Sequence, residues 1–216
     1  MQDNRRVRGV NAVVASARKE ASQIGIDVLK KGGNAVDAAV ATGFALGVCE
    51  PSASGIGGGG FMMINNCSLP EPVLIDFREI APRAASADMY KVNADGSVVN
   101  EENSIGGKSV AVPGEIAGLI YALENYGTMP LMEVIEPSVR LAEEGFIVTE
   151  MMCNHFFDKP VKTDKYYKNL QKGQLYRNPD LAKTLSLISR EGMKAFYEGE
   201  IADKIIAAVH KYNGII

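Results

Sequence analysis

The sequence predicts a mixed fold, α+β or layered α/β, with strands early in the chain and helices late. Short apolar runs bounded by turn residues lie at 61–64 and 73–77, as expected of β-strands. Stretches with apolar residues three or four apart dominate the second half. The length of 216 residues suits one large domain or two small ones, and the 46% hydrophobic composition can build a sizeable core. We interpret residues 1–216 as a single domain.

The first 50 residues contain one expected strand and two expected helices. Residues 10–15 are β-like, and Ser16 is placed to cap a helix that runs to about Lys31. Two glycines at 32–33 end that helix. Asn34 caps the next helix, with Asp37 three residues later as in a capping box. This second helix is rich in alanine, and we expect it inside the domain.

A run of glycines follows the second helix. Gly55, Gly57 and Gly60 match the G-x-G-x-x-G spacing of a dinucleotide-binding turn. That turn needs a strand before it and a helix after it, so that the helix N-terminus faces the pyrophosphate. Here a helix precedes the glycines, and a short apolar strand, expected to be buried, follows them. The sequence therefore argues against nucleotide binding and predicts glycines that adopt positive φ values and allow close packing.

Beyond the glycines we expect a hairpin and then mostly helices. The strands at 61–64 and 73–77 can pair through a tight connection at Asn65 and Asn66. After Asp88 the pattern is mainly helical. Proline and glycine delimit two helices, at 113–126 and 130–144. Apolar residues three or four apart predict two more, at 180–190 and 200–211.

Charge and hydropathy exclude several classes of partner. The formal net charge of -3 and the pI near 5.5 disfavour nucleic acid and anionic membranes. No apolar run reaches the roughly 20 residues that span a bilayer, and no secretory signal is visible. Residues 159–177 are basic and contain tyrosines, but acidic neighbours favour a solvated helical face over a nucleic-acid patch.

We expect no metal and no cofactor. Cys49, Cys67 and Cys153 are widely spaced, which favours small buried hydrophobic residues over a disulfide framework or a metal site. His155 and His210 are the only histidines, and neither has a suitably spaced acid or cysteine partner.

Short motifs occur in order along nearly the whole chain. They are Gly32-Gly-Asn-Ala-Val-Asp-Ala-Ala39, Glu50-Pro51, Ser54-Gly-Ile-Gly-Gly-Gly-Gly-Phe-Met62, Asp76-Phe-Arg-Glu-Ile-Ala-Pro82, Ser109-Val-Ala-Val-Pro-Gly114, Tyr126-Gly-Thr, Pro137-x-x-x-Leu141-Ala-x-x-Gly145-Phe and Phe196-Tyr-x-Gly199. Together they resemble the γ-glutamyltranspeptidase family, in the N-terminal part of its large subunit.

The resemblance implies an αββα sandwich of the N-terminal-nucleophile hydrolase type, incomplete in this chain. Members of that family are precursors that cleave themselves into a large and a small subunit. The new N-terminal threonine of the small subunit passes a γ-glutamyl group, through an acyl-enzyme, to water or to an amine. The implied partners are a small γ-glutamyl substrate, of the glutathione or poly-γ-glutamate type, and the small subunit of the same precursor.

One position carries a role over from the family. The resemblance implies that Arg78 binds the α-carboxylate of the γ-glutamyl substrate, which suits a guanidinium because it can form two parallel charge-assisted hydrogen bonds. The alternative is that Arg78 merely pairs with Asp76 or Glu79 at the end of a strand.

No residue of this chain is expected to be catalytic. The family's nucleophile is normally followed by Thr-His-like residues, and none of the five threonines here precedes a histidine. We therefore expect the catalytic threonine beyond this chain and expect the isolated chain to be inactive. The alternatives are a related acylase of the same fold and a non-catalytic scaffold or pseudoenzyme. Family resemblance suggests an extracellular, periplasmic or cell-surface location, which the sequence itself does not establish.

Overall fold

A computed structural model of the chain describes residues 7–157, 167 and 170–216. Contacts divide the chain into two compact units. The first comprises the described residues up to Ile56 together with Leu119–Arg190, and the second comprises Gly57–Gly118 and Glu191–Ile216. We describe each unit by itself, and the single-domain organisation stays a prediction.

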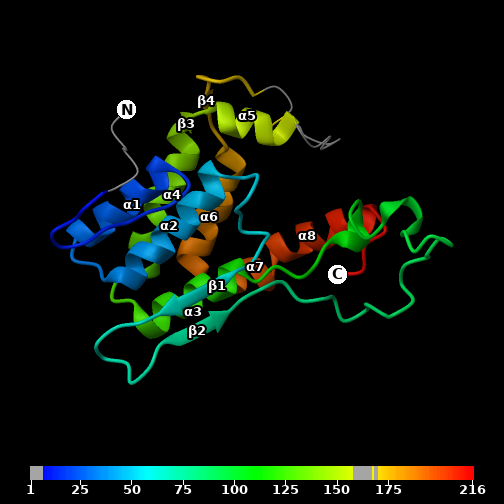
Figure 1. Cartoon of the computed structure of the whole chain (residues 1–216), viewed down its shortest axis with the longest axis horizontal. Coiled ribbons are helices and arrows are strands. Elements are labelled where there is room, and N and C mark those ends of the chain that lie inside the picture. Colours follow the sequence, from blue (N-terminus) through cyan, green and yellow to red (C-terminus); the bar gives the residue numbers. More distant parts are fainter. Residues whose placement is uncertain (1–6, 158–166, 168–169) are drawn as a thin grey trace. The chain divides into compact units, whose positions relative to one another are not determined.

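The first unit is built mainly from helices (Figure 1). Helix α2 contacts both α1 and α4. The short strands β3 and β4 pair antiparallel, with Phe146 opposite Tyr176. The elements of this unit are α1 (Lys19–Lys30), α2 (Ala35–Cys49), most of α3 (Glu115–Tyr126), α4 (Leu131–Glu144), β3 (Phe146–Ile147), α5 (Glu150–Phe157), β4 (Leu175–Tyr176) and α6 (Pro179–Glu191).

Helix α2 forms as predicted and lies in the core of this unit. The Asn34 side chain accepts hydrogen bonds from the backbone of Val36 and Asp37, and the Asp37 side chain accepts one from the Asn34 amide, which completes the capping box. Gly32, with φ of 95°, ends the preceding helix as expected. Because its small side chains allow close approach, α2 is buried on nearly all sides.

The start of the chain differs from the prediction in two ways. Residues 10–15 do not form a strand, since no described strand lies beside them to supply hydrogen bonds. Helix α1 begins at Lys19 with Arg18 at the N-cap position, so Ser16 is not the cap. The Ser16 hydroxyl instead donates to the carbonyl oxygen of Arg18, at 2.8 Å.

The second unit contains the predicted hairpin. Strands β1 (Phe61–Ile64) and β2 (Val73–Asp76) pair antiparallel, with Phe61 opposite Asp76 and Ile64 opposite Val73. The chain reverses over residues 65–72, which is a longer connection than the tight turn we expected.

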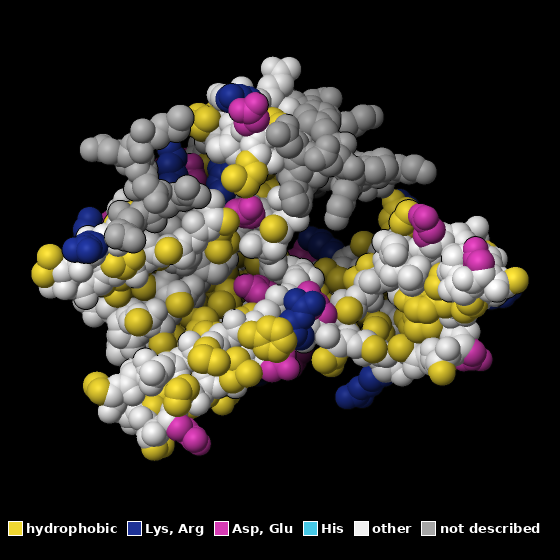
Figure 2. Space-filling model, in the orientation of Figure 1, with side chains coloured by type: hydrophobic (Ala, Val, Ile, Leu, Met, Phe, Trp, Pro, Cys, Tyr) yellow, Lys and Arg dark blue, Asp and Glu magenta, His cyan; other side chains and the backbone are white. Residues whose placement is uncertain are grey.

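The predicted burial of β1 is wrong, because one face of the hairpin is open to solvent. Phe61 is 60% exposed, Met63 72% and Leu74 58%, whereas Ile64 at the strand end is buried. Hydrophobic side chains therefore gather on the surface over the hairpin (Figure 2).

The expected helical pattern directly after Asp88 is also wrong. Residues 77–114 are largely irregular, with two single-turn 3₁₀ helices, η1 (Val99–Glu101) and η2 (Gly107–Ser109), and isolated bridges such as Ile80 with Val112. The stretch 93–107 is rich in Asn, Asp, Ser and Gly, which favour turns over helices. Regular helices resume at α3, α7 (Met193–Tyr197) and α8 (Glu200–Lys211).

Three remaining expectations concern exposure. Cys49 and Cys153 are buried as expected, but Cys67 is exposed because it lies in the connection between the strands. The proposed helical face at 159–177 falls mostly outside the described residues, and its last part forms β4. Within the described part of the chain, no helix combines the length and apolar character needed to cross a bilayer.

Candidate functional site

Arg78 lies immediately beyond the hairpin, where the chain leaves β2. The Phe77 amide donates to the carbonyl oxygen of Gly60 at 3.0 Å, and the Gly60 amide donates to that of Phe77 at 3.3 Å. These bonds extend the strand pairing by one residue. The Asp76 carboxylate accepts a hydrogen bond from the Arg78 amide at 3.0 Å. The backbone at Arg78 is therefore fixed beside the glycine run.

The Arg78 guanidinium is held on one side and open on the other. Its Nη2 atom lies 3.0 Å from Glu79 Oε2, and its Nη1 atom donates to the carbonyl oxygen of Gly59 at 3.4 Å. The side chain is nevertheless 54% exposed. A guanidinium has five N–H groups, so donors remain for an incoming carboxylate. The pairing with Glu79 that we considered as an alternative is thus present, and it leaves room for a ligand.

Phe77 explains why glycines lie beside Arg78. A Cβ atom on Gly60 would lie 3.1 Å from the Phe77 ring, and one on Gly118 would overlap that ring. A Cβ atom on Gly59 would overlap the carbonyl oxygen of Phe77. Close packing is therefore confirmed for part of the glycine run. The positive φ values that we predicted for this run are wrong, because the glycines with positive φ lie elsewhere in the chain.

Glu115, the first residue of α3, is a second carboxyl group beside the glycine run. The amides of Gly114 and Glu115 both donate to the carbonyl oxygen of Gly58 at 2.9 Å, which ties the start of α3 to the glycine run. A Cβ atom on Gly60 would lie 3.9 Å from Glu115 Oε2. Burial, and then the negative charge of Glu79, raise the pKa of Glu115 to about 7. Nothing in the amino-acid pattern pointed to Glu115 beyond the helix start predicted after Pro113.

Tyr197 of α7 fixes the first turn of α3. Its hydroxyl donates to the carbonyl oxygen of Pro113 at 3.0 Å and accepts from the Ala117 amide at 3.2 Å. The second bond satisfies an amide that the helix itself leaves without a partner. Burial, with a smaller contribution from the charge of Glu115, raises the pKa of Tyr197. This contact makes the position of Glu115 rigid.

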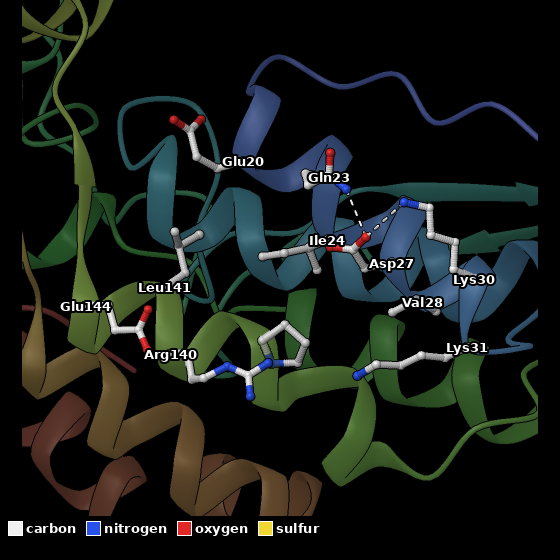
Figure 3. A pocket seen from close by; sticks show the side chains of 11 residues that line it. Glu20, Gln23, Ile24, Asp27, Val28, Lys30, Lys31, Arg140, Leu141 and Glu144 are labelled. Carbon is white, nitrogen blue, oxygen red and sulfur yellow. Dashed lines mark hydrogen bonds and ion pairs between the residues drawn. The ribbon is translucent and has the colours of Figure 1, made fainter. Parts of the chain in front are cut away.

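A groove of about 600 Å³ between α1 and α4 is a separate hollow in the first unit (Figure 3). Asp27 accepts a hydrogen bond from Gln23 at 2.9 Å and lies 3.6 Å from the Lys30 ammonium. Arg140 lies 2.9 Å from Glu136. Since Asp27, Lys30 and Arg140 are already paired on exposed helix surfaces, we assign no ligand to the groove.

The threonines that the structure describes are engaged in structural hydrogen bonds. Thr42 donates to the carbonyl oxygen of Ala38, Thr128 to Asp37 and Thr184 to the carbonyl oxygen of Asp180, while Thr149 accepts from Arg18. Thr163 lies outside the described residues. Among the described residues, no group of three or more His, Cys, Asp or Glu side chains is arranged to hold a metal ion.

Comparisons with known proteins agree on one family. A family model described as gamma-glutamyltranspeptidase matches residues 21–216. The "Glutathione hydrolase proenzyme" of Pseudomonas sp. (strain A14) is 41% identical over 217 residues, which cover 95% of this chain and 37% of that protein.

Solved structures give the same result. The gamma-glutamyltranspeptidase from Pseudomonas nitroreducens, complexed with L-DON, matches with a TM-score of 0.90 and 37% identity, over 97% of this chain and 63% of that chain. The cephalosporin acylase from Bacillus halodurans matches with a TM-score of 0.78 and 28% identity, over 98% of this chain and 42% of that chain. These neighbours confirm the predicted fold class, an αββα sandwich of which this chain supplies part. The chain spans 37% of the curated relative's length.

Proposed function

Because the chain belongs to the gamma-glutamyltranspeptidase family, we propose that the complete protein hydrolyses or transfers γ-glutamyl groups and that Arg78 binds the substrate α-carboxylate. The chain corresponds to the N-terminal part of the large subunit. The observation that carries the proposal is the Arg78 guanidinium, which Glu79 and Gly59 hold on one side while the side chain stays 54% exposed.

In the proposed reaction, this part of the protein positions the γ-glutamyl group. A threonine hydroxyl oxygen forms an ester with the γ-carbonyl carbon, the amide C–N bond breaks, and the amine leaves with a proton. Water or another amine then attacks the ester and releases the glutamyl group. None of the five threonines of this chain precedes a histidine, and those that the structure describes are engaged in structural hydrogen bonds. We therefore place the nucleophile outside this chain and expect the isolated 216-residue chain to be inactive.

Arg78 contributes by fixing the glutamyl group at its far end. Two parallel charge-assisted hydrogen bonds orient the α-carboxylate and thereby place the γ-carbonyl relative to the nucleophile. Gly59, Asp76 and Glu79 hold the backbone and side chain of Arg78, so its orientation does not depend on the substrate alone.

The small subunit of the same precursor is the proposed protein partner. Curated relatives are named proenzymes, which is consistent with a protein that matures by cleavage. The exposed Phe61, Met63 and Leu74 side chains form an apolar face on the hairpin. Such a face in a family member supports a contact with the rest of the enzyme.

Substitution of Arg78 tests the proposal. In the complete protein that contains this chain, Arg78→Ala should lower kcat/KM for a γ-glutamyl anilide by about 100-fold or more, because the charged hydrogen bonds to the carboxylate are lost. Arg78→Lys should restore only part of the loss, since an ammonium group cannot form the two-pronged contact. The matched control is Arg83→Ala, an exposed arginine five residues later.

A second substrate distinguishes a loss of carboxylate binding in Arg78→Ala from a general loss of folding. An anilide of the same length that lacks the α-carboxylate should be a poor substrate, and its kcat/KM should be nearly the same for wild type and Arg78→Ala. An Arg78→Ala enzyme that retains full activity toward the γ-glutamyl anilide would contradict the proposed role of Arg78.

The similarity to a cephalosporin acylase supports one alternative, an acylase of the same fold. Faster cleavage of an amide without an α-carboxylate than of the γ-glutamyl anilide would favour that alternative. A complete protein that neither cleaves itself nor turns over either substrate would indicate a scaffold. Two fragments by intact mass, the smaller with an N-terminal threonine, would support the γ-glutamyl enzyme.

A further inference from the structure

Glu115 has no place in the proposed mechanism, although its charge interacts with that of Glu79, the partner of Arg78. Its carboxyl group lies beside Gly60, and its backbone amide donates to Gly58, one residue before the glycine whose carbonyl oxygen accepts from Arg78. It is half-buried at the first position of α3. When this carboxyl group loses its proton, the site gains one negative charge, and when it is protonated the site loses that charge.

The groups that face Glu115 hold it in place without neutralising it. From the segment after β2, Glu79 presents a second carboxylate, which is 3.0 Å from Arg78 Nη2. From α7, Tyr197 uses its hydroxyl on the backbone of Pro113 and Ala117. The glycine run presents backbone alone. No described residue donates a hydrogen bond to the Glu115 carboxyl group or forms an ion pair with it.

We propose that Glu115 is a positioning residue of the carboxylate-binding site and that its charge, acting through Glu79, sets how tightly Arg78 binds an incoming carboxylate. The inference rests on the proposed function and adds a regulator to the same site.

The physical argument concerns the balance of charge around one guanidinium. With Glu115 neutral, Arg78 and Glu79 form one ion pair, and an incoming carboxylate adds a single negative charge. With Glu115 ionised, a second negative charge acts on Glu79, the partner of Arg78, and an incoming carboxylate meets more repulsion at the site. Because burial and the charge of Glu79 raise the pKa of Glu115 to about 7, this change occurs near neutral pH. Binding of the anionic group should therefore weaken as the pH rises.

The experiment measures kcat and KM separately across pH in the complete protein that contains this chain. The substrate is a γ-glutamyl anilide, and the range runs from about pH 5.5 to about pH 8.5, on both sides of the Glu115 transition. Wild-type KM should rise by roughly three- to tenfold, as expected for one added charge within a few ångströms of the ligand. Glu115→Gln should abolish most of that rise while kcat keeps its own pH profile.

Two further variants exclude a merely structural effect. Glu124→Gln makes the same chemical change at an exposed position of α3 and should keep the wild-type KM profile. Glu79→Gln removes the neighbouring charge, so the midpoint of the KM profile should move to lower pH. A structural role for Glu115 would alter stability without moving this midpoint.

The outcomes separate the two proposals. If KM depends on Arg78 but Glu115→Gln keeps the wild-type pH profile, the inference about Glu115 is overturned and the proposed function stands. If turnover does not depend on Arg78, or if no γ-glutamyl substrate is used, both are overturned. If the profile flattens in Glu115→Gln alone and shifts in Glu79→Gln, both are supported.

Discussion

Two carboxyl groups at the starts of helices, one in each unit, show how differently the chain treats the same chemical group. Asp37 in α2 has no exposed surface and accepts hydrogen bonds from the Asn34, Thr128 and Met129 amides and from the Thr128 hydroxyl, at 2.7 to 3.1 Å. Glu115 in α3 is half-buried and receives no hydrogen bond from a described side chain or amide.

The pKa values of the two groups move in opposite directions for this reason. Burial alone would raise the pKa of Asp37, but the hydrogen bonds from Thr128, Asn34 and Met129 outweigh it and lower the pKa. Glu115 has burial and the charge of Glu79 without compensating donors, so its pKa rises to about 7. A carboxylate surrounded by donors fixes structure, whereas one without donors remains free to respond to pH and to a ligand.

The largest expected effect is the loss of the Asp37 network. Asp37→Ala removes a fully buried carboxylate and leaves the amides of Asn34, Thr128 and Met129 without their acceptor, so it should lower the free energy of unfolding by about 3 to 5 kcal/mol. Urea denaturation followed by circular dichroism measures this change. Asp27→Ala, at an exposed position of α1, should cost less than about 1 kcal/mol. Equal effects of the two substitutions would contradict the structural role of Asp37.

The same residue sets a pH dependence with a definite sign. The folded-state pKa of Asp37 lies below its ordinary value of 3.8, so its stabilising contribution is fully present above that value. This contribution is lost as the pH falls through the lowered pKa. The difference between wild type and Asp37→Ala should therefore shrink in acid.

A glycine substitution tests how closely the backbone segments beside Arg78 must approach. At Gly59 a Cβ atom would overlap the Phe77 carbonyl oxygen and lie 3.0 Å from the Glu79 amide nitrogen. Gly59→Ala should destabilise the protein by about 2 kcal/mol and lower kcat/KM about tenfold, because the Arg78 segment must shift. Gly57 has open space at its Cβ position, so Gly57→Ala is the matched control. A fully active Gly59→Ala enzyme would show that the close approach is not needed.

The smallest expected effect is a gain in stability. The folded-state pKa of Glu115 is raised from 4.5 to about 7, so the protonated side chain favours the folded state at low pH, and this contribution is lost as the pH rises through 7. At about pH 8, Glu115→Gln should be more stable than wild type by about 1 to 2 kcal/mol, after allowance for solvent screening. Below about pH 4.5 the two should be equal. Thermal unfolding at both pH values checks this, and a variant less stable than wild type at pH 8 would contradict the account of Glu115.

The same contrast shows what the sequence could predict. The Asn34–Asp37 capping box depends on two residues three apart in the sequence. The start of α2 could therefore be predicted from the capping residues, and its burial from its alanine-rich composition. Arg78 could be proposed as a candidate because it lies in a recognisable motif after an apolar strand. The state of Glu115 could not, since it depends on Glu79, which is 36 residues earlier in the chain and near it only after folding.

The solvent exposure of strand β1 was the other feature that sequence patterns could not predict. An apolar strand such as Phe61–Ile64 has the same composition whether or not another part of the described structure covers it, so its sequence does not predict its exposure. The helical pattern predicted after Asp88 is wrong over residues 93–107, because the Asn, Asp, Ser and Gly residues of this stretch favour turns.

The solvent-facing side of the hairpin also bears on how the protein is made. A two-stranded hairpin is marginal by itself in water, and this one displays Phe61, Met63 and Leu74. At synthesis rates of about 5 to 20 residues per second, the remainder of this chain takes on the order of ten seconds to leave the ribosome after β2. Throughout that interval the nascent hairpin is a target for chaperones and a site for aggregation. Expression yield should therefore depend on chaperone supply more strongly than the stability of the mature protein suggests.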